Sequence, residues 1–215
     1  MKREDIHIII IALNNDIRSA FLSNLARERK FKVTVLPGVN LGDQRITEER
    51  NKNYNYNKNR YLKTTEVACR LAHYDACQYV IEHKIENYIV CEDDLEFIDF
   101  TTILAKFKKI RIGDFWNFSG QEALKMDQYF KLRTKFFGSC LTKLELGFFY
   151  RLCCYTTPIQ NLESVCSFFK EGSGYVADDF KSMQKETGLN IMFSPLSRHP
   201  SDLKLSHIES SRRGL

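Results

Sequence analysis

Three consecutive acidic residues, Glu92, Asp93 and Asp94, follow directly on the apolar run YIVC at residues 88–91. Adjacent carboxylates repel one another, so they are expected either in a solvated turn or beside a cation. Clustered carboxylates with few competing soft ligands suit hard divalent cations such as Mg²⁺ or Mn²⁺. The apolar run predicts a buried strand whose carboxyl end carries the acids, and open α/β sheets bind ligands at that end. The pattern favours a cation site over a solvated turn.

A second acidic pair, Asp178 and Asp179, lies in the segment YVADDF and follows the turn Gly172-Ser173-Gly174. A glycine-rich turn lets the backbone approach a ligand closely. A carboxylate placed there could accept a proton from a reacting hydroxyl. The alternative is that one of the two acids caps a helix that begins near Phe180. Both interpretations stay open, because two adjacent acids can divide these duties.

Cys69, His73 and Cys77 recur at intervals of four residues and therefore share one face of a predicted helix. This stripe resembles a set of metal ligands. However, three ligands on one straight helix cannot surround an ion, so we interpret the stripe as a buried helix face.

The elements that must position these residues form an α/β pattern. Residues 6–13 and the segment FKVTVLPGV predict two buried strands with a helix over 17–29 between them, which is a β-α-β unit with a parallel sheet. The sequence also predicts helices over 64–84, 99–109 and 158–170 and a strand at DFWNFSG. No linker divides the chain, so residues 1–215 are expected to form a single domain.

Two segments lack clear periodicity. Residues 39–63 are polar and rich in asparagine, which predicts a long mobile loop. Residues 195–215 predict an irregular C-terminal tail.

Charge and cysteine content limit the possible partners and compartment. The net charge is +5, from 32 basic and 27 acidic residues, and no nucleic-acid-binding motif accompanies it. The seven cysteines are odd in number and contain no C-x-x-C pair, which indicates a reducing, cytoplasmic setting.

The N-terminal apolar run is too short for a membrane span. A basic run at Lys106, Lys108, Lys109 and Arg111 is expected to be a solvated helix face, and the alternative is peripheral contact with anionic lipid at the inner membrane.

Residues 64–97, TTEVACRLAHYDACQYVIEHKIENYIVCEDDLEF, resemble the central signature of glycosyltransferase family 25, which contains lipopolysaccharide and lipooligosaccharide glycosyltransferases. The residues that keep the family's order and spacing are Glu66, Cys69, His73 and Glu92-Asp93-Asp94. Ala68 and Ala72 replace a glycine and a serine of the family pattern, and both replacements are small. YVADDF and the segment SPLSRHPSDLKLSHIESS resemble later family motifs more loosely.

The resemblance implies a GT-A-like, Rossmann-type, mostly parallel sheet flanked by helices, and a nucleotide-sugar donor. It implies that Asp94 binds Mn²⁺ (or Mg²⁺), with His199 or His207 as a further metal ligand. By the same resemblance, Glu92, Asp93, His73 and Glu66 lie on the donor side. Inversion at the sugar needs a base, for which Asp178 is the first candidate and Asp179 the second.

The leading hypothesis is therefore a metal-dependent, inverting bacterial hexosyltransferase. It would move galactose from UDP-galactose onto a lipooligosaccharide or a related surface glycan, in the cytoplasm or at the inner face of the cytoplasmic membrane. One alternative is the same fold with UDP-glucose or UDP-N-acetylglucosamine as donor. A second is a catalytically inactive relative that serves as a binding module. Nucleic-acid binding would rest only on mild basicity and aromatic content, without a motif.

Overall fold

The structure is a computed structural model of the whole chain. It describes residues 2–12, 16–50, 52, 54–55, 59–95, 97–119, 139–140, 152–170 and 174–198. The two histidines predicted as further metal ligands, His199 and His207, lie outside these residues.

The described strands form one eight-stranded sheet and a separate hairpin. The sheet has the order β2-β1-β5-β9-β7-β10-β6, and β8 also pairs with β10. Strands β2, β1, β5, β7 and β10 run in one direction, whereas β9, β6 and β8 run in the other. The bounds of these strands are β1 His7–Ala12, β2 Lys32–Pro37, β5 Tyr88–Glu92, β6 Phe97–Ile98, β7 Asp114–Ser119, β8 Ser139–Cys140, β9 Cys154–Thr156 and β10 Asn190–Arg198. The predicted Rossmann-like, mostly parallel α/β sheet is confirmed.

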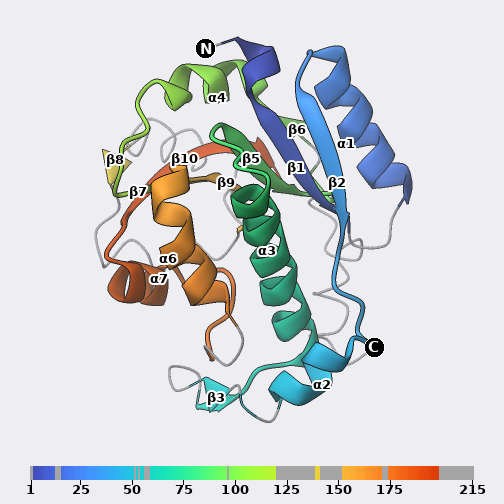
Figure 1. Cartoon of the computed structure of the whole chain (residues 1–215), viewed down its shortest axis with the longest axis vertical. Helices are drawn as coiled ribbons and strands as arrows, with labels where there is room; N and C mark the ends of the chain where they lie inside the picture. The colour runs from blue at the N-terminus through green and yellow to red at the C-terminus, as the bar shows by residue number, and fades with distance from the viewer. Residues whose placement is uncertain are drawn as a thin grey trace, which may run out of the picture.

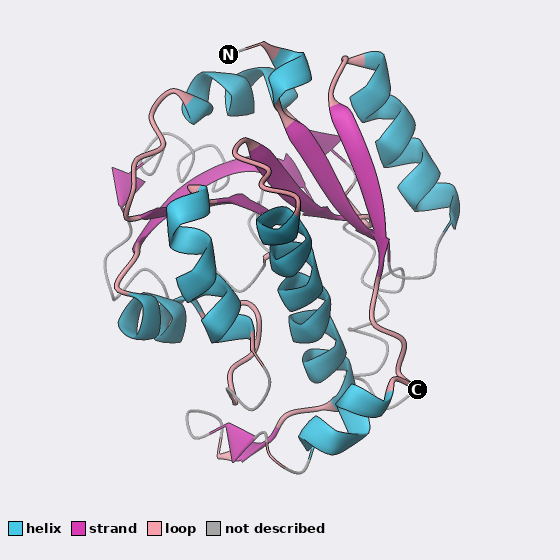
Figure 2. Ribbon diagram, in the orientation of Figure 1, coloured by secondary structure: helices cyan, strands magenta, loops and turns pink. Residues whose placement is uncertain are grey.

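Helices cover both faces of this sheet (Figures 1 and 2). Helices α3 (Thr64–Glu82), α6 (Ile159–Phe169) and α7 (Phe180–Thr187) share one core with the sheet. Helices α1 (Asp16–Glu28) and α4 (Phe100–Phe107) share the other. A 3₁₀ turn, η1 (Arg3–Asp5), precedes β1. None of the helices in the described part of the chain has the length and apolar character needed to span a bilayer.

Strand β1 shows why the apolar runs of this sequence become central strands. Ile9 and Ile11 pack into the core under α3, whereas Ile8 and Ile10 pack into the core under α1 and α4. Successive side chains of a strand point to opposite faces, so a strand that is covered on both sides must be apolar throughout. The same reason accounts for YIVC in β5, where Tyr88 and Val90 face one core and Ile89 and Cys91 face the other.

Residues 39–63, predicted as an unbroken loop, contain regular structure. Helix α2 spans Gln44–Arg50, and strands β3 (Tyr54–Asn55) and β4 (Arg60–Tyr61) pair as an antiparallel hairpin. Ile46 and Leu62 are buried in a small cluster with side chains from the first turns of α3 and with Val176. The sequence prediction was wrong here because two isolated apolar residues give no periodic signal, while tertiary contacts with α3 order the segment.

The first residues of the predicted irregular tail form a strand instead. Strand β10 continues to Arg198, and Ser197 and Arg198 pair with β6. The pairing with β7 shifts register between Phe193 and Ser197, and Pro195 lies inside that shift. Proline cannot donate to a ladder, so it is accommodated where the regular pairing is interrupted. Residues 199–215 lie outside the described part of the chain.

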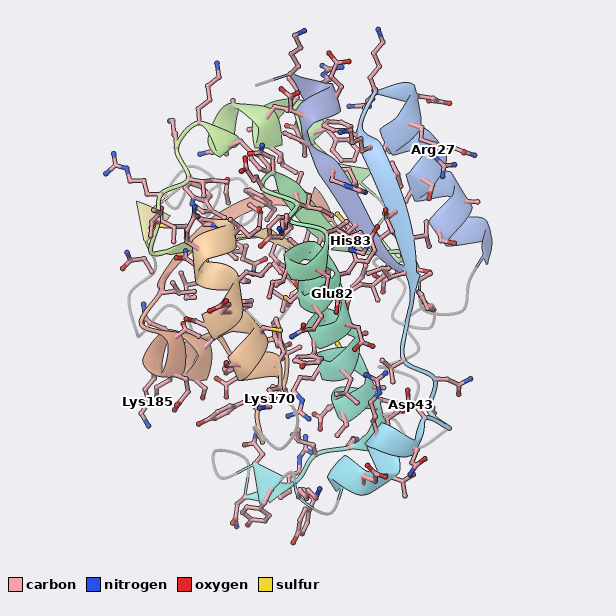
Figure 3. The ribbon with its side chains drawn as sticks, viewed as in Figure 1. Arg27, Asp43, Glu82, His83, Lys170 and Lys185 are labelled. Atoms are coloured by element: carbon pink, nitrogen blue, oxygen red, sulfur yellow. The ribbon has the colours of Figure 1, made fainter. Side chains whose placement is uncertain are left out.

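Charged side chains on the outer surfaces of the helices point away from the sheet, as Arg27, Lys170 and Lys185 do in Figure 3. Lys106 is different. Its side chain is 3% exposed, and its Nζ lies 5.7 Å from the centre of the Trp116 ring. Lys106 was expected to lie on a solvated basic face, but it is buried. Burial, with a smaller effect of Lys109, lowers the pKa of Lys106.

Gly174 precedes the turn that carries Asp178 and lies against the backbone of the β3–β4 hairpin. Its φ is +70°, and a Cβ at this position would lie 2.7 Å from the carbonyl oxygen of Tyr54. Gly188 also has a positive φ of +71°, but a Cβ built on it would meet no atom within 4 Å. Substitution of Gly188 therefore measures the cost of the backbone conformation alone, without a steric clash. We expect Gly188→Ala to cost about 1–2 kcal/mol of unfolding free energy. Gly174→Ala should cost roughly 1–3 kcal/mol more, because the backbone of β3 must also move. Denaturant unfolding of the two variants measures the difference, and equal losses would show that the hairpin does not pack against this turn.

Candidate active site

The acidic residues lie at the carboxyl end of β5, in the middle of the sheet. The backbone of the turn is fixed on both sides. The Glu92 N–H donates to the Cys153 carbonyl at 2.9 Å, and the Asp93 N–H donates to the Ile11 carbonyl at 3.0 Å. The polypeptide therefore cannot relax this turn outward without breaking bonds to the segment before β9 and to β1.

The carboxylates are not in a solvated turn. The exposed fractions of Glu92, Asp93 and Asp94 are 7%, 2% and 6%. Burying three adjacent like charges is unfavourable unless positive charge or hydrogen bonds compensate them. Carboxylate oxygens are the ligands that a hard divalent cation prefers, so Asp94 stays the predicted metal ligand.

His73 links helix α3 to the acidic turn. Its Nε2 lies 3.3 Å from Oε1 of Glu92, and the side chain is 1% exposed. The imidazole forms an aromatic cluster with Tyr155 in β9 and Phe169 in α6, at centroid distances of 5.5 and 5.6 Å, and those two rings lie 6.5 Å from each other. The cluster buries the ring, while its Nε2 faces Glu92.

Cys69 lies one helical turn before His73 and contacts the same carboxylate. Its Sγ is 3.7 Å from Oε1 of Glu92. Desolvation, followed by the negative charges of Glu92 and Asp178, raises the pKa of the Cys69 thiol well above its usual range, and Asp94 adds to the effect. The thiol is therefore protonated at neutral pH. Asp178, in the turn before α7, and the acids at the end of β5 therefore lie close enough to Cys69 to act on its thiol.

The two acids of YVADDF have different surroundings. Asp179 is the N-cap of α7, where its Oδ1 accepts from the Ser182 N–H at 3.0 Å and its Oδ2 from the Ser182 hydroxyl at 2.8 Å. Asp178, one residue earlier, is half-buried and acts on Cys69. The helix-capping alternative therefore describes Asp179, and Asp178 is the acid of the pair that acts on the Cys69 thiol.

Glu66, predicted on the donor side, has structural contacts at the start of α3. It accepts from the Lys63 N–H at 2.9 Å as part of a capping box. It also binds the Arg60 guanidinium at 2.6 and 2.8 Å while being 5% exposed itself. The hydrogen bonds to Glu66 raise the pKa of Arg60. The pair ties the β3–β4 hairpin to α3. Arg60 could not be identified from the sequence, because it lies in the segment that was predicted to be a loop.

The Cys69–His73–Cys77 stripe divides into two parts. Cys69 and His73 face Glu92, whereas the Cys77 thiol lies 3.7 Å from the Tyr155 hydroxyl inside the core. The three residues together are thus not a set of metal ligands. This agrees with the sequence analysis, which interpreted the stripe as a buried helix face. The contacts of Tyr155 with the Cys77 thiol and the His73 ring could not be predicted from the sequence. The region before β9 shows no periodic pattern that would place Tyr155 beside α3.

Fold and site together define an α/β protein whose Rossmann-like sheet presents buried carboxylates at the carboxyl end of a central strand. A comparison with protein families gives a match to glycosyltransferase family 25 (LPS biosynthesis protein) over residues 5–171. The chain belongs to this family, and it is therefore a glycosyltransferase of the lipopolysaccharide-biosynthesis type. A comparison with curated proteins gives no match. The matched residues include Glu66, Cys69, His73 and the three acids of β5, whereas Asp178 and Asp179 lie beyond them.

Proposed function

We propose that the chain transfers a hexose from a UDP-sugar, with galactose from UDP-galactose as the first candidate, onto a lipooligosaccharide or a related surface glycan. The observation that supports this proposal is that three buried carboxylates end β5 and that Asp178, from another part of the chain, acts on the same Cys69 thiol as Glu92 and Asp94. A donor handled at the end of β5 would then lie within reach of a carboxylate from another part of the chain.

The donor side of the proposed site is formed by Glu92, Asp93 and Asp94. A divalent cation, Mn²⁺ or Mg²⁺, would neutralise the negative charge that develops on the departing UDP. Asp94 would hold that ion, with His199 or His207 as a further ligand. Glu92 contacts His73 and Cys69, and these contacts would hold its carboxylate in one orientation when the donor binds.

The acceptor side of the proposed site is Asp178. For inversion, the acceptor hydroxyl attacks the anomeric carbon on the face opposite UDP, the bond from that carbon to the UDP oxygen breaks, and the hydroxyl proton passes to a base. Asp178 is the candidate for this base. Asp179 orients the turn by capping α7, because both of its oxygens accept hydrogen bonds from Ser182.

We propose a cytoplasmic location, with the acceptor reached at the inner face of the membrane. The exposed basic residues Lys108, Lys109 and Arg111 support contact with anionic lipid, while Lys106 is buried and does not contribute.

A panel of UDP-sugars tests the donor. The chain is incubated with Mn²⁺ and UDP-galactose, UDP-glucose or UDP-N-acetylglucosamine, and released UDP is measured with and without chelator. We expect UDP-galactose to be hydrolysed fastest, and we expect chelation to stop the reaction. Faster turnover of another UDP-sugar would correct the donor, whereas no binding or turnover of any UDP-sugar would favour a non-catalytic binding module.

A further inference from the structure

Cys69, His73 and Glu92 form a compact group of three different ligand types. One ligand atom from each lies within 4.8 Å of the others. Two side chains come from one helix at an i, i+4 spacing, and the third comes from the neighbouring strand β5. Three ligands on one straight helix cannot surround an ion, but the ligands of this group approach a common point from a helix and a strand.

Two of the three distances within the group match those of a tetrahedral ion. Zinc bound by S, N and O atoms at about 2.0–2.3 Å separates its ligand atoms by roughly 3.3–3.8 Å. In the structure, Glu92 Oε1 lies 3.3 Å from His73 Nε2 and 3.7 Å from Cys69 Sγ. The third pair, Cys69 and His73, lies within 4.8 Å, so rotation of the side chains would bring all three atoms around one ion.

The chemistry of the group differs from that of the three β5 acids. Thiolate and imidazole are soft or borderline ligands that select Zn²⁺, whereas carboxylates alone select Mg²⁺, Ca²⁺ or Mn²⁺. One thiolate and one carboxylate would also balance the two charges of the ion. Cys69 is partly exposed, so an ion has access from the surface, while His73 is buried.

The histidine must give up its Nε2 proton to bind an ion. Its Nε2 faces the Glu92 carboxylate, which only accepts hydrogen bonds, so the neutral ring carries its proton on Nε2. Its Nδ1 is buried and has no hydrogen-bond partner among the described residues, so this nitrogen can take up the proton when an ion binds at Nε2. Resident metal sites hold the second ring nitrogen of a histidine ligand with an acceptor, which raises the affinity. Since His73 lacks this support, the site is suited to an exchangeable ion.

We propose that Cys69, His73 and Glu92 form an inhibitory site for Zn²⁺, distinct from the cation site at Asp94. Binding would release the thiol proton of Cys69 to solvent and would shift the ring proton of His73 from Nε2 to Nδ1, and a water molecule would fill the fourth position. Inhibition follows because the ion engages Glu92, which the proposed function places on the donor side. This consequence rests on the proposed function, whereas the binding itself does not.

Binding is tested directly on the full chain, without any donor, by titration with Zn²⁺ and Co²⁺ in excess Mg²⁺, which fills oxygen-ligand sites. We expect one equivalent of ion and a thiolate-to-cobalt charge-transfer absorption. Cys69→Ser should remove that absorption and weaken Zn²⁺ binding at least tenfold. Cys77→Ala is the matched control, because Cys77 lies one turn beyond His73 with its thiol at Tyr155, and it should bind as the unmodified chain does.

Three outcomes would overturn the site: no Zn²⁺ bound by the unmodified chain, unchanged affinity in Cys69→Ser, or loss of binding in Cys77→Ala. Thermal unfolding of each variant shows whether it is folded. If the ion binds as expected but no UDP-sugar is ever turned over, the proposed function fails and the zinc site stands. If UDP-sugar turnover is normal and unaffected by bound Zn²⁺, the site is not inhibitory.

Discussion

Asp178→Asn is expected to lower kcat by about 10²–10⁴-fold, which is the range that a positioned general base contributes. The substitution keeps the size of the side chain but removes its ability to accept the acceptor proton. Donor binding should change little, because the β5 carboxylates are intact. The measurement is the rate of transfer to acceptor, together with the affinity for UDP-sugar in the same variant.

Asp179→Asn is the matched control for this prediction. Asparagine caps helices about as well as aspartate does, so α7 should keep its N-terminus and kcat should stay within a few-fold of the unmodified chain. If instead Asp179→Asn abolishes transfer and Asp178→Asn does not, the two acids have been assigned the wrong duties. If neither substitution affects transfer, the base lies elsewhere.

The second large effect is expected at Asp94. Asp94→Asn should reduce metal-dependent transfer by about 10²–10³-fold, the size of effect seen when one group that stabilises developing charge is removed. The loss should be accompanied by a higher Mn²⁺ concentration for half-maximal activity, because asparagine is a weaker ligand than carboxylate. Activity is measured as a function of Mn²⁺ concentration for both proteins.

A nearby acid with a purely structural contact provides the control. Asp99 caps α4, where its Oδ1 accepts from the Thr102 N–H at 3.0 Å. Asp99→Asn should keep this cap and leave the Mn²⁺ dependence unchanged. An unaltered Mn²⁺ profile in Asp94→Asn, or an equal shift in both variants, would remove Asp94 from the proposed metal site.

The central strands and the main helices could be predicted from the sequence because their signals are local. A continuous apolar run such as YIVC has one stable placement in a domain of this size, a strand covered on both faces. Helix α3 was predicted over 64–84 and observed over Thr64–Glu82. The family resemblance also depended on this pair of elements, since Cys69, His73 and Glu92 lie in one helix and the following strand.

The remaining features depend on contacts between distant residues. Helix α2 and the β3–β4 hairpin are ordered by Ile46, Leu62 and the Arg60–Glu66 pair, none of which forms a periodic pattern. Strand β9 has three residues and runs antiparallel between β5 and β7. No rule of local propensity fixes the direction of so short a strand. The duties of Asp178 and Asp179 likewise became distinct only through the bonds of Asp179 to Ser182.

The central claim is that the acids at the end of β5 handle the donor. A crystal structure of the chain with UDP and Mn²⁺, with the ion located by its anomalous scattering, tests this most directly. The account predicts Mn²⁺ bound by the Asp94 carboxylate and by pyrophosphate oxygens of UDP at the carboxyl end of β5. Mn²⁺ and UDP bound at any other place, with Glu92, Asp93 and Asp94 remote from both, would contradict it.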